Sequence, residues 1–249
     1  HIEKYVCPTV TSDQMLGGVP YRFATDPRRH IVFLIGEREY RTRETLPVFA
    51  AKYLSSGFRC TFVLADEKDH NRFRGIEAIR DADVLFVSVR RRALPGGDLK
   101  LIREHVQAGK PVVGIRTASH AFSLRGKTAP EGHAVWENWD AEVIGGNYSG
   151  HHGSKLKTKV WSLDAARPLL GQKEPVRFES AGSLYINTPT RPGQEVLLMG
   201  GVDGVDRDEP VAWTFRRRDG GRTFYTSLGH VGDFEQAAFN EMLVKAVMW

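Results

Sequence analysis

Short apolar runs alternate with longer amphipathic segments through the first half of this chain. Four of these runs have the length and the β-branched content of buried strands, at residues 31–36, 58–64, 84–89 and 111–115. Between them, residues 45–55 and 98–108 carry apolar side chains at helical spacing. Strands that alternate with helices at this interval predict a doubly wound, mostly parallel α/β sheet of the flavodoxin-like type.

The second half has shorter apolar runs and longer loops. We expect short strands at residues 143–144, 159–163, 183–186 and 196–199. A hairpin with an Asp-Gly turn is predicted over 211–227, and a closing helix with Asp233 as its N-cap over 233–248. The second half is therefore expected to be elaborated and partly antiparallel.

The domain organisation follows from the same pattern. Residues 1–29 lack periodicity and contain paired glycines, Pro20 and Pro27, which predicts an arm packed on the domain. No linker or repeat interrupts residues 30–249, so we expect them to form a single α/β domain.

Polar residues directly follow several of the predicted strands. Glu37 comes after the first strand, Arg90 after the third, and Arg116, Ser119 and His120 after the fourth. In an open parallel sheet, ligands bind beyond the carboxyl ends of the strands. This rule predicts that Arg116 and His120 lie near Glu37 and Arg90. The alternative is that strand ends are polar because they meet water.

Histidines are concentrated in one part of the chain. Four of the nine fall between residues 120 and 152, and a fifth, His230, ends a predicted strand beside a glycine. His151 lies in a glycine-rich segment whose polar groups are available to a ligand. Glu37, His120, His151 and His230 are therefore candidate acid/base residues, with structural hydrogen bonds as the alternative for each histidine. We expect the His230 ring to face the same crevice as His151, with one nitrogen held by a hydrogen bond.

The composition and charge of the chain limit the classes of binding partner that we expect. The chain has 249 residues, 41% hydrophobic residues and a net charge of +5. It carries arginine triplets at 90–92 and 216–218 but no recognisable nucleic-acid module, so nucleic acid is not an expected partner. The arginines at 216–218 are expected to be solvated at the hairpin tip. No apolar run is long enough to span a bilayer, and no membrane association is predicted.

Several catalytic and cofactor motifs are missing. The first strand lacks Gly-x-Gly-x-x-Gly, and neither Gly-x-Ser-x-Gly nor His-Glu-x-x-His occurs. His151 and His152 are adjacent, so in an extended segment they would face opposite ways. We therefore predict no cofactor, with a divalent metal ion kept as the alternative. The chain starts at His1, and its compartment is left open between the cytoplasm and a periplasmic or secreted location.

Several segments resemble ThuA-like, or trehalose-utilisation, proteins. These are the first strand, the turn at Arg116, and residues 136–139, 145–151, 210–214, 221–230 and 239–249. The resemblance implies the class I glutamine amidotransferase-like fold and a role in carbohydrate metabolism, on disaccharides or keto-sugars.

Arg116 and positions 182–183 depart from the family pattern. In class I glutamine amidotransferases the turn at Arg116 would hold the cysteine nucleophile, and ThuA-like proteins often carry histidine there. They also often have Asp-Glu where this chain has Gly-Ser at 182–183. Neither Cys7 nor Cys60 is near Arg116 in sequence, so no glutaminase activity is expected.

The candidate ligand-binding residues combine cations and aromatic rings. Arg90 and Arg116 would anchor an anionic or hydroxyl-rich ligand together with Ser119. Tyr148 and Trp136 offer flat apolar faces for a sugar ring, with core packing as the alternative for Trp136. The expected ligand is a sugar-like small molecule.

The leading hypothesis is an enzyme, a hydrolase, lyase or isomerase, that acts on a sugar-derived substrate. A non-catalytic carbohydrate-binding or assembly module is the first alternative, and a metal-dependent hydrolase is the second. The sequence leaves open whether the chain forms a homo-oligomer.

Overall fold

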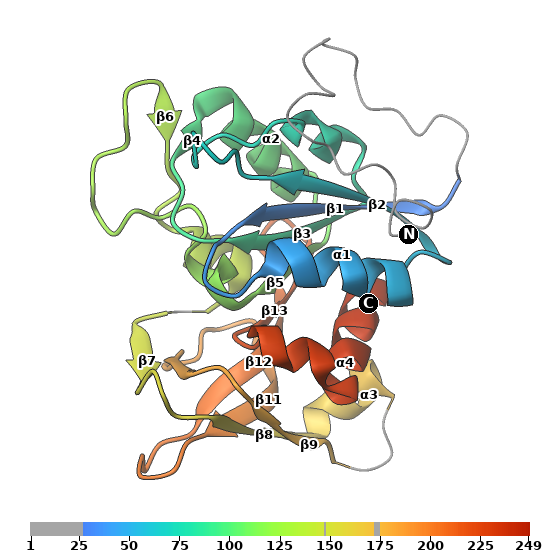
Figure 1. The fold of residues 1–249 in the computed structure, drawn as a ribbon, viewed down its shortest axis with the longest axis vertical. Coiled ribbons are helices and arrows are strands. Elements are labelled where there is room, and N and C mark those ends of the chain that lie inside the picture. The colour runs from blue at the N-terminus through green and yellow to red at the C-terminus, as the bar shows by residue number, and fades with distance from the viewer. Residues whose placement is uncertain (1–26, 147, 172–174) are drawn as a thin grey trace.

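A nine-stranded sheet with the order β2-β1-β3-β5-β13-β12-β11-β8-β9 organises the computed structural model, which describes residues 27–146, 148–171 and 175–249 (Figure 1). Its first five strands run parallel to one another. They are β2 (Phe58–Leu64), β1 (Arg29–Gly36), β3 (Val84–Val89), β5 (Val112–Ile115) and β13 (Arg222–Thr226). This is the strand order of the flavodoxin-like type, so the predicted fold class is confirmed.

The rest of the sheet is antiparallel. It consists of β12 (Glu209–Arg216), β11 (Gln194–Gly201), β8 (Thr158–Ser162) and β9 (Arg177–Ser180). Two small antiparallel pairs lie outside the main sheet. They are formed by β10 (Leu184–Ile186) with β7 (Gly150–His152), and by β4 (Leu94–Pro95) with β6 (His133–Ala134).

Helices cover both faces of the sheet, because successive strand residues point to opposite sides. Ile31, Phe33 and Ile35 of β1 pack in a core with α1 (Thr42–Tyr53) and α4 (Ala237–Met248). Figure 1 shows these two helices on the same face. Val32 and Leu34 belong to the other core, with α2 (Gly96–Gln107) and the short 3-10 helix η2 (Ile76–Asp81). A short helix α3 (Arg167–Leu170), preceded by the turn η5 (Asp164–Ala166), packs near α4.

The predicted strand at residues 143–144 is wrong. These residues end a π-helical turn, η4 (Asp140–Ile144), and both are buried. Trp213 Nε1 donates a hydrogen bond to the Ile144 carbonyl at 2.9 Å. A Cβ on Gly146 would come within 2.2 Å of the Trp213 ring, so the turn passes too close to the sheet for a larger residue. Tertiary packing on Trp213 therefore overrides a β-branched pair too short to define a strand.

The predicted role of Asp233 as the cap of the closing helix is also wrong. A 3-10 turn, η6 (Val231–Glu235), comes first, and α4 begins only at Ala237. The Asp233 carboxylate is fully buried and accepts hydrogen bonds from the backbone N–H groups of Gly229 and His230 and from the Ser180 hydroxyl. Asp233 therefore joins the end of β13 to the end of β9.

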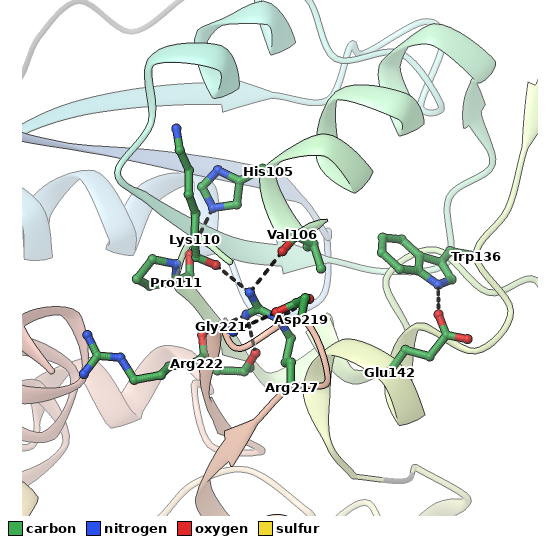
Figure 2. A network of polar contacts seen from close by, with 11 residues as sticks. His105, Val106, Lys110, Pro111, Trp136, Glu142, Arg217, Asp219, Gly221 and Arg222 are labelled. Carbon is green, nitrogen blue, oxygen red and sulfur yellow. Dashed lines mark hydrogen bonds and ion pairs between the residues drawn. The ribbon is translucent and has the colours of Figure 1, made fainter. Parts of the chain in front are cut away.

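The arginine triplet of the β12–β13 hairpin is only partly solvated. Arg216 and Arg218 are exposed, but Arg217 is buried. Figure 2 shows its guanidinium donating to the Lys110 carbonyl at 2.7 Å and pairing with Asp219 at 3.1 Å. The hydrogen bonds hold the hairpin against the end of α2, which corrects the expectation of three solvated side chains.

The N-terminal arm and the absence of a membrane-spanning segment were both predicted from the sequence. The predicted arm over residues 1–29 lies outside the described residues except for its last three positions. No helix in the described ranges is long and apolar enough to cross a membrane.

Candidate functional site

A cavity of about 290 Å³ lies where the parallel strands end. The loops after β1, β3 and β5 contribute five of its lining side chains, Glu39, Tyr40, Arg90, Arg116 and His120. The rule that places ligands beyond the carboxyl ends of parallel strands therefore locates the cavity.

The second half of the chain closes the cavity from the other side. It contributes Tyr148, His151 in β7, Ser183 and Tyr185 at β10, and His230 at the start of η6. His230 follows β13, and the other four reach the sheet edge because they belong to the long segment between β5 and β13.

The structure brings together six of the nine residues predicted for the site. Arg90, Arg116, His120, Tyr148, His151 and His230 all line this cavity. Ser119 lines a smaller neighbouring cavity, whereas Glu37 and Trp136 line neither.

Arg116 is held as a buried cation at the start of the 3-10 turn η3 (Arg116–His120). Its side chain is almost fully enclosed, and its guanidinium lies 4.7 Å from the ring centre of Tyr40 and 4.2 Å from that of Tyr185. Nη1 donates to the carbonyls of Ser183 and Ser227 at 2.9 and 2.7 Å. The arginine is therefore held between two aromatic faces and two carbonyl oxygens.

The backbone of Arg116 is as constrained as its side chain. Its φ of 48° lies in the left-handed region, which side chains other than glycine rarely adopt. The Tyr225 hydroxyl donates to the Arg116 carbonyl at 2.6 Å. Gly229, with a φ of 120°, packs close to the Arg116 Cβ. The neighbouring strand β13 thus supports a strained turn directly after β5.

His120 is a neutral imidazole in a basic environment. Its ring stacks on Tyr148 with 4.4 Å between centroids, and its Nδ1 lies 3.0 Å from the Ser119 hydroxyl oxygen. Burial, followed by the charges of Arg91 and Arg90, lowers the pKa of His120 to about 2. The ring can exchange hydrogen bonds with a ligand without carrying charge at neutral pH.

A smaller cavity of about 80 Å³ shares His120 and Tyr148 with the main one. Arg91, Arg125 and Asp140 are among its other lining residues. The stacked rings of His120 and Tyr148 therefore form the wall common to both cavities.

His230 is positioned by the backbone that follows it. It is the N-cap of η6, where its Nδ1 accepts a hydrogen bond from the Gly232 N–H at 3.3 Å. Its ring meets that of Tyr40 edge to face at 6.0 Å. Because Nδ1 is an acceptor here, a neutral His230 ring carries its proton on Nε2. His230 and His151 line the same cavity, as the sequence predicts.

Glu37 caps a helix rather than lining the cavity. Its buried carboxylate accepts hydrogen bonds from the Tyr40 N–H at 2.7 Å and from the Thr42 N–H at 2.8 Å. Thr42 is the first residue of α1 and Tyr40 precedes the N-cap Arg41, which supplies no side-chain bond of its own. The exposed Glu39 lines the cavity instead and forms an ion pair with Arg90 at 2.6 Å.

Trp136 packs in the core. The sequence left open whether its ring stacks on a sugar or packs in the core. It is buried, and its Nε1 donates to Glu142 at 2.6 Å, as Figure 2 shows. Its ring packs against Trp139 at 5.3 Å and under the guanidinium of Arg103 at 4.0 Å. This placement agrees with the packing alternative.

The residues missed from the sequence differ in how they could have been found. Glu39 and Tyr40 follow the first strand, where the sheet-edge rule already directs attention. Ser183 and Tyr185 belong to β10, which pairs only with β7, so no local pattern places them beside Arg116. Within the described ranges, no three His, Cys, Asp or Glu side chains converge as a metal site would require.

The fold and the turn at Arg116 define a class of protein. A doubly wound sheet of this strand order is the glutamine amidotransferase-like type of fold that the sequence resemblance implies. The chain belongs to the ThuA family, described as trehalose utilisation, which matches residues 30–249. This membership supports a carbohydrate-related role.

Solved structures agree with this assignment at the level of the fold. A ThuA-like protein from Bacteroides uniformis has a TM-score of 0.64 and 17% identity, over 93% of this chain and 95% of that chain. A ThuA-like protein from Parabacteroides merdae has a TM-score of 0.60 and 16% identity, over 89% of each chain. No curated protein sequence matches this chain.

Proposed function

We propose that this chain is an enzyme that transfers protons on a sugar-derived small molecule held in the 290 Å³ cavity. The observation that carries the proposal is the convergence of His120, His151 and His230 on one cavity with the Glu39–Arg90 pair. Histidines in a cavity are the usual groups for acid/base chemistry near neutral pH. Membership of the ThuA family supports a sugar-derived substrate.

The geometry suggests distinct roles for the three histidines. The neutral His120 would polarise a substrate oxygen through a hydrogen bond, since it gains no charge of its own at neutral pH. His230 presents Nε2, because its Nδ1 is engaged by the backbone. His151 is exposed and would exchange protons with solvent. The set suits removal of a proton next to a carbonyl group, as in an isomerase or a lyase.

The size of the cavity limits the substrate. Ligand pockets range from about 300 to 1,000 Å³, and this cavity lies at the lower end of that range. A single monosaccharide unit therefore fits the proposal better than a longer saccharide. Tyr148 and Tyr185 would supply the apolar faces against which a sugar ring packs.

A carbohydrate-binding module without catalysis is the second candidate. It is favoured by the three tyrosines of the cavity, which would bind a sugar whether or not any proton moves. Binding without turnover separates it from the enzyme.

Proton abstraction can be detected without knowing the product. The purified chain is incubated in D₂O with a panel of keto-sugars and aldoses, and deuterium next to the carbonyl is followed by NMR. The expected result is incorporation into at least one sugar, reduced about 10²- to 10⁴-fold by His230→Asn or His151→Ala. The affinity of these variants for that sugar should stay within about tenfold of the unmodified chain.

The matched control is His133→Ala, because His133 lies in β6 and does not line the cavity. It should exchange deuterium at the unmodified rate. A sugar that binds in the cavity and never acquires deuterium would contradict the enzyme and support the binding module.

A further inference from the structure

Arg116 differs from the other buried arginines in its lack of an acidic partner. Arg59 and Arg217 are also largely buried, and they pair with Asp81 at 3.5 Å and Asp219 at 3.1 Å. Within the described residues, no carboxylate forms an ion pair with Arg116, and its Nε has no hydrogen-bond partner. A buried charge is normally paired, so the charge of this guanidinium is available to compensate that of an anionic ligand.

The charges of the lining side chains favour an anion over a cation. Glu39 is the only acidic residue among the described residues that line the cavity, and Arg90 already neutralises it. Two arginines and one glutamate leave the lining with one uncompensated positive charge. The other polar side chains of the described lining are hydroxyls and imidazoles, which can donate as well as accept and so can hydrogen-bond an oxyanion.

Several strained arginines surround the site. In the described ranges, the four non-glycine residues with positive φ are all arginines. Their φ angles are 57° at Arg41, 47° at Arg91, 48° at Arg116 and 55° at Arg125. Burial, followed by the charges of Arg91, Arg90, Arg125 and Arg116, lowers the pKa of the His120 ring. Arg116 lines the main cavity, whereas Arg91 and Arg125 line the smaller one, so positive charge lies on both sides of the wall formed by His120 and Tyr148.

We propose that the ligand of this cavity is a monosaccharide-sized sugar derivative bearing an oxyanion, a carboxylate or a phosphate, which lies against Arg116. This assignment rests on the proposed function and names the substrate class for it. Ser183 Oγ accepts a hydrogen bond from Arg116 Nη2 at 3.0 Å, so its own proton is left for the oxyanion. His230 Nε2 offers a second donor. The positive charge of Arg116 compensates the oxyanion charge behind these donors.

The test compares each acidic sugar with the neutral sugar that has the same ring stereochemistry. Binding of D-glucuronate, D-glucose 6-phosphate and D-glucose, and of D-galacturonate and D-galactose, is measured by calorimetry at equal ionic strength. A charge-assisted contact should favour an acidic sugar over its neutral counterpart by about tenfold or more in Kd. The glucuronate and 6-phosphate arms show whether the oxyanion is a carboxylate or a phosphate.

Variants assign the preference to the cavity. Arg116→Gln should bring the affinities for acidic and neutral sugars together, whereas Arg216→Gln, at an exposed position of the hairpin, should leave the preference unchanged. If Arg116→Gln does not fold, Arg90→Gln provides the second route. It frees the Glu39 charge and should weaken the acidic sugar about tenfold while sparing the neutral one.

The outcomes separate this inference from the proposed activity. Equal affinity for acidic and neutral sugars, or no binding of any acidic sugar, would overturn the oxyanion site. A preference for acidic sugars that both arginine variants retain would overturn it as well. A preference lost in those variants, without deuterium exchange, would support the oxyanion site and contradict the enzyme.

Discussion

Glu37 and Glu39 stand two residues apart and have different surroundings. Both follow β1. The carboxylate of Glu37 accepts hydrogen bonds from the N–H groups of Tyr40 and Thr42 around the start of α1, while that of Glu39 pairs with Arg90 at the cavity. The difference arises because the first N–H groups of a helix have no partner within it. A buried carboxylate beside such N–H groups accepts several hydrogen bonds, and its oxygens are then not available to a ligand.

Exchanging each carboxylate for an amide separates the two roles. Glu37→Gln should lower the free energy of unfolding by about 1–3 kcal/mol, because it weakens charge-assisted hydrogen bonds to Tyr40 and Thr42. Glu39→Gln, at an exposed position, should change it by less than about 0.5 kcal/mol. Urea unfolding at pH 7 measures both. A larger loss for Glu39→Gln than for Glu37→Gln would contradict the capping role.

At the scale of elements, the β12–β13 hairpin is anchored by its middle arginine. Arg217 donates to the carbonyls of Lys110, Arg222 and Val106, and it pairs with Asp219. Alternation along the strand explains why it points inward while its two neighbours point to solvent. The hairpin carries β13, whose Tyr225 supports the turn at Arg116, so this anchor also positions the site.

Removing the buried guanidinium should therefore destabilise the whole sheet. Arg217→Gln is expected to cost about 3–5 kcal/mol, because it leaves Asp219 and several carbonyls unpaired. Arg216→Gln and Arg218→Gln, at exposed positions, should each stay within about 0.5 kcal/mol. Thermal and denaturant unfolding of the three variants provide the comparison. Similar losses in all three would show that net charge, rather than the anchor, is responsible.

At the scale of the whole molecule, buried histidines couple the fold to pH. Burial lowers the pKa of His30 and of His105 to about 4, and that of His120 to about 2. In the unfolded chain these rings titrate near pH 6.5. Below that pH the unfolded state binds more protons than the folded state, so the free energy of unfolding decreases as the pH falls.

The free energy of unfolding should therefore decrease between pH 6.5 and about pH 4, and change little from these groups above pH 7. Each histidine adds at most about 1.4 kcal/mol per pH unit to the slope. Denaturant unfolding at pH 7.5, 6.5 and 5.5 measures it. His105→Gln, which keeps a donor for the Pro111 carbonyl, should reduce the slope by one histidine's share. A slope that this variant leaves unchanged would exclude His105 as a source.

The elements of the parallel half were predictable because each depends on a local pattern. The apolar runs that form β1, β2, β3 and β5 are buried on both faces of the sheet, and such runs are read directly from the sequence. The edge at which the cavity lies followed from the same pattern, since parallel strands end together. Arg90, Arg116, His120 and His230 lie in the cavity for this reason, whereas Tyr148 and His151 reach it from outside the main sheet.

The sequence by itself thus determined the class of fold, the sheet edge that holds the cavity and the cations and histidines available there. Only the tertiary structure decided that Glu37 caps α1, that Trp136 packs in the core, and that Tyr185 encloses Arg116. The enclosure of Arg116 depends on contacts between segments far apart in the chain, such as the 2.7 Å bond from Arg116 to the Ser227 carbonyl, whereas the bond from Thr42 to Glu37 spans only five residues. Periodicity records which side of an element is buried, whereas the partner on that side is set by how distant segments pack.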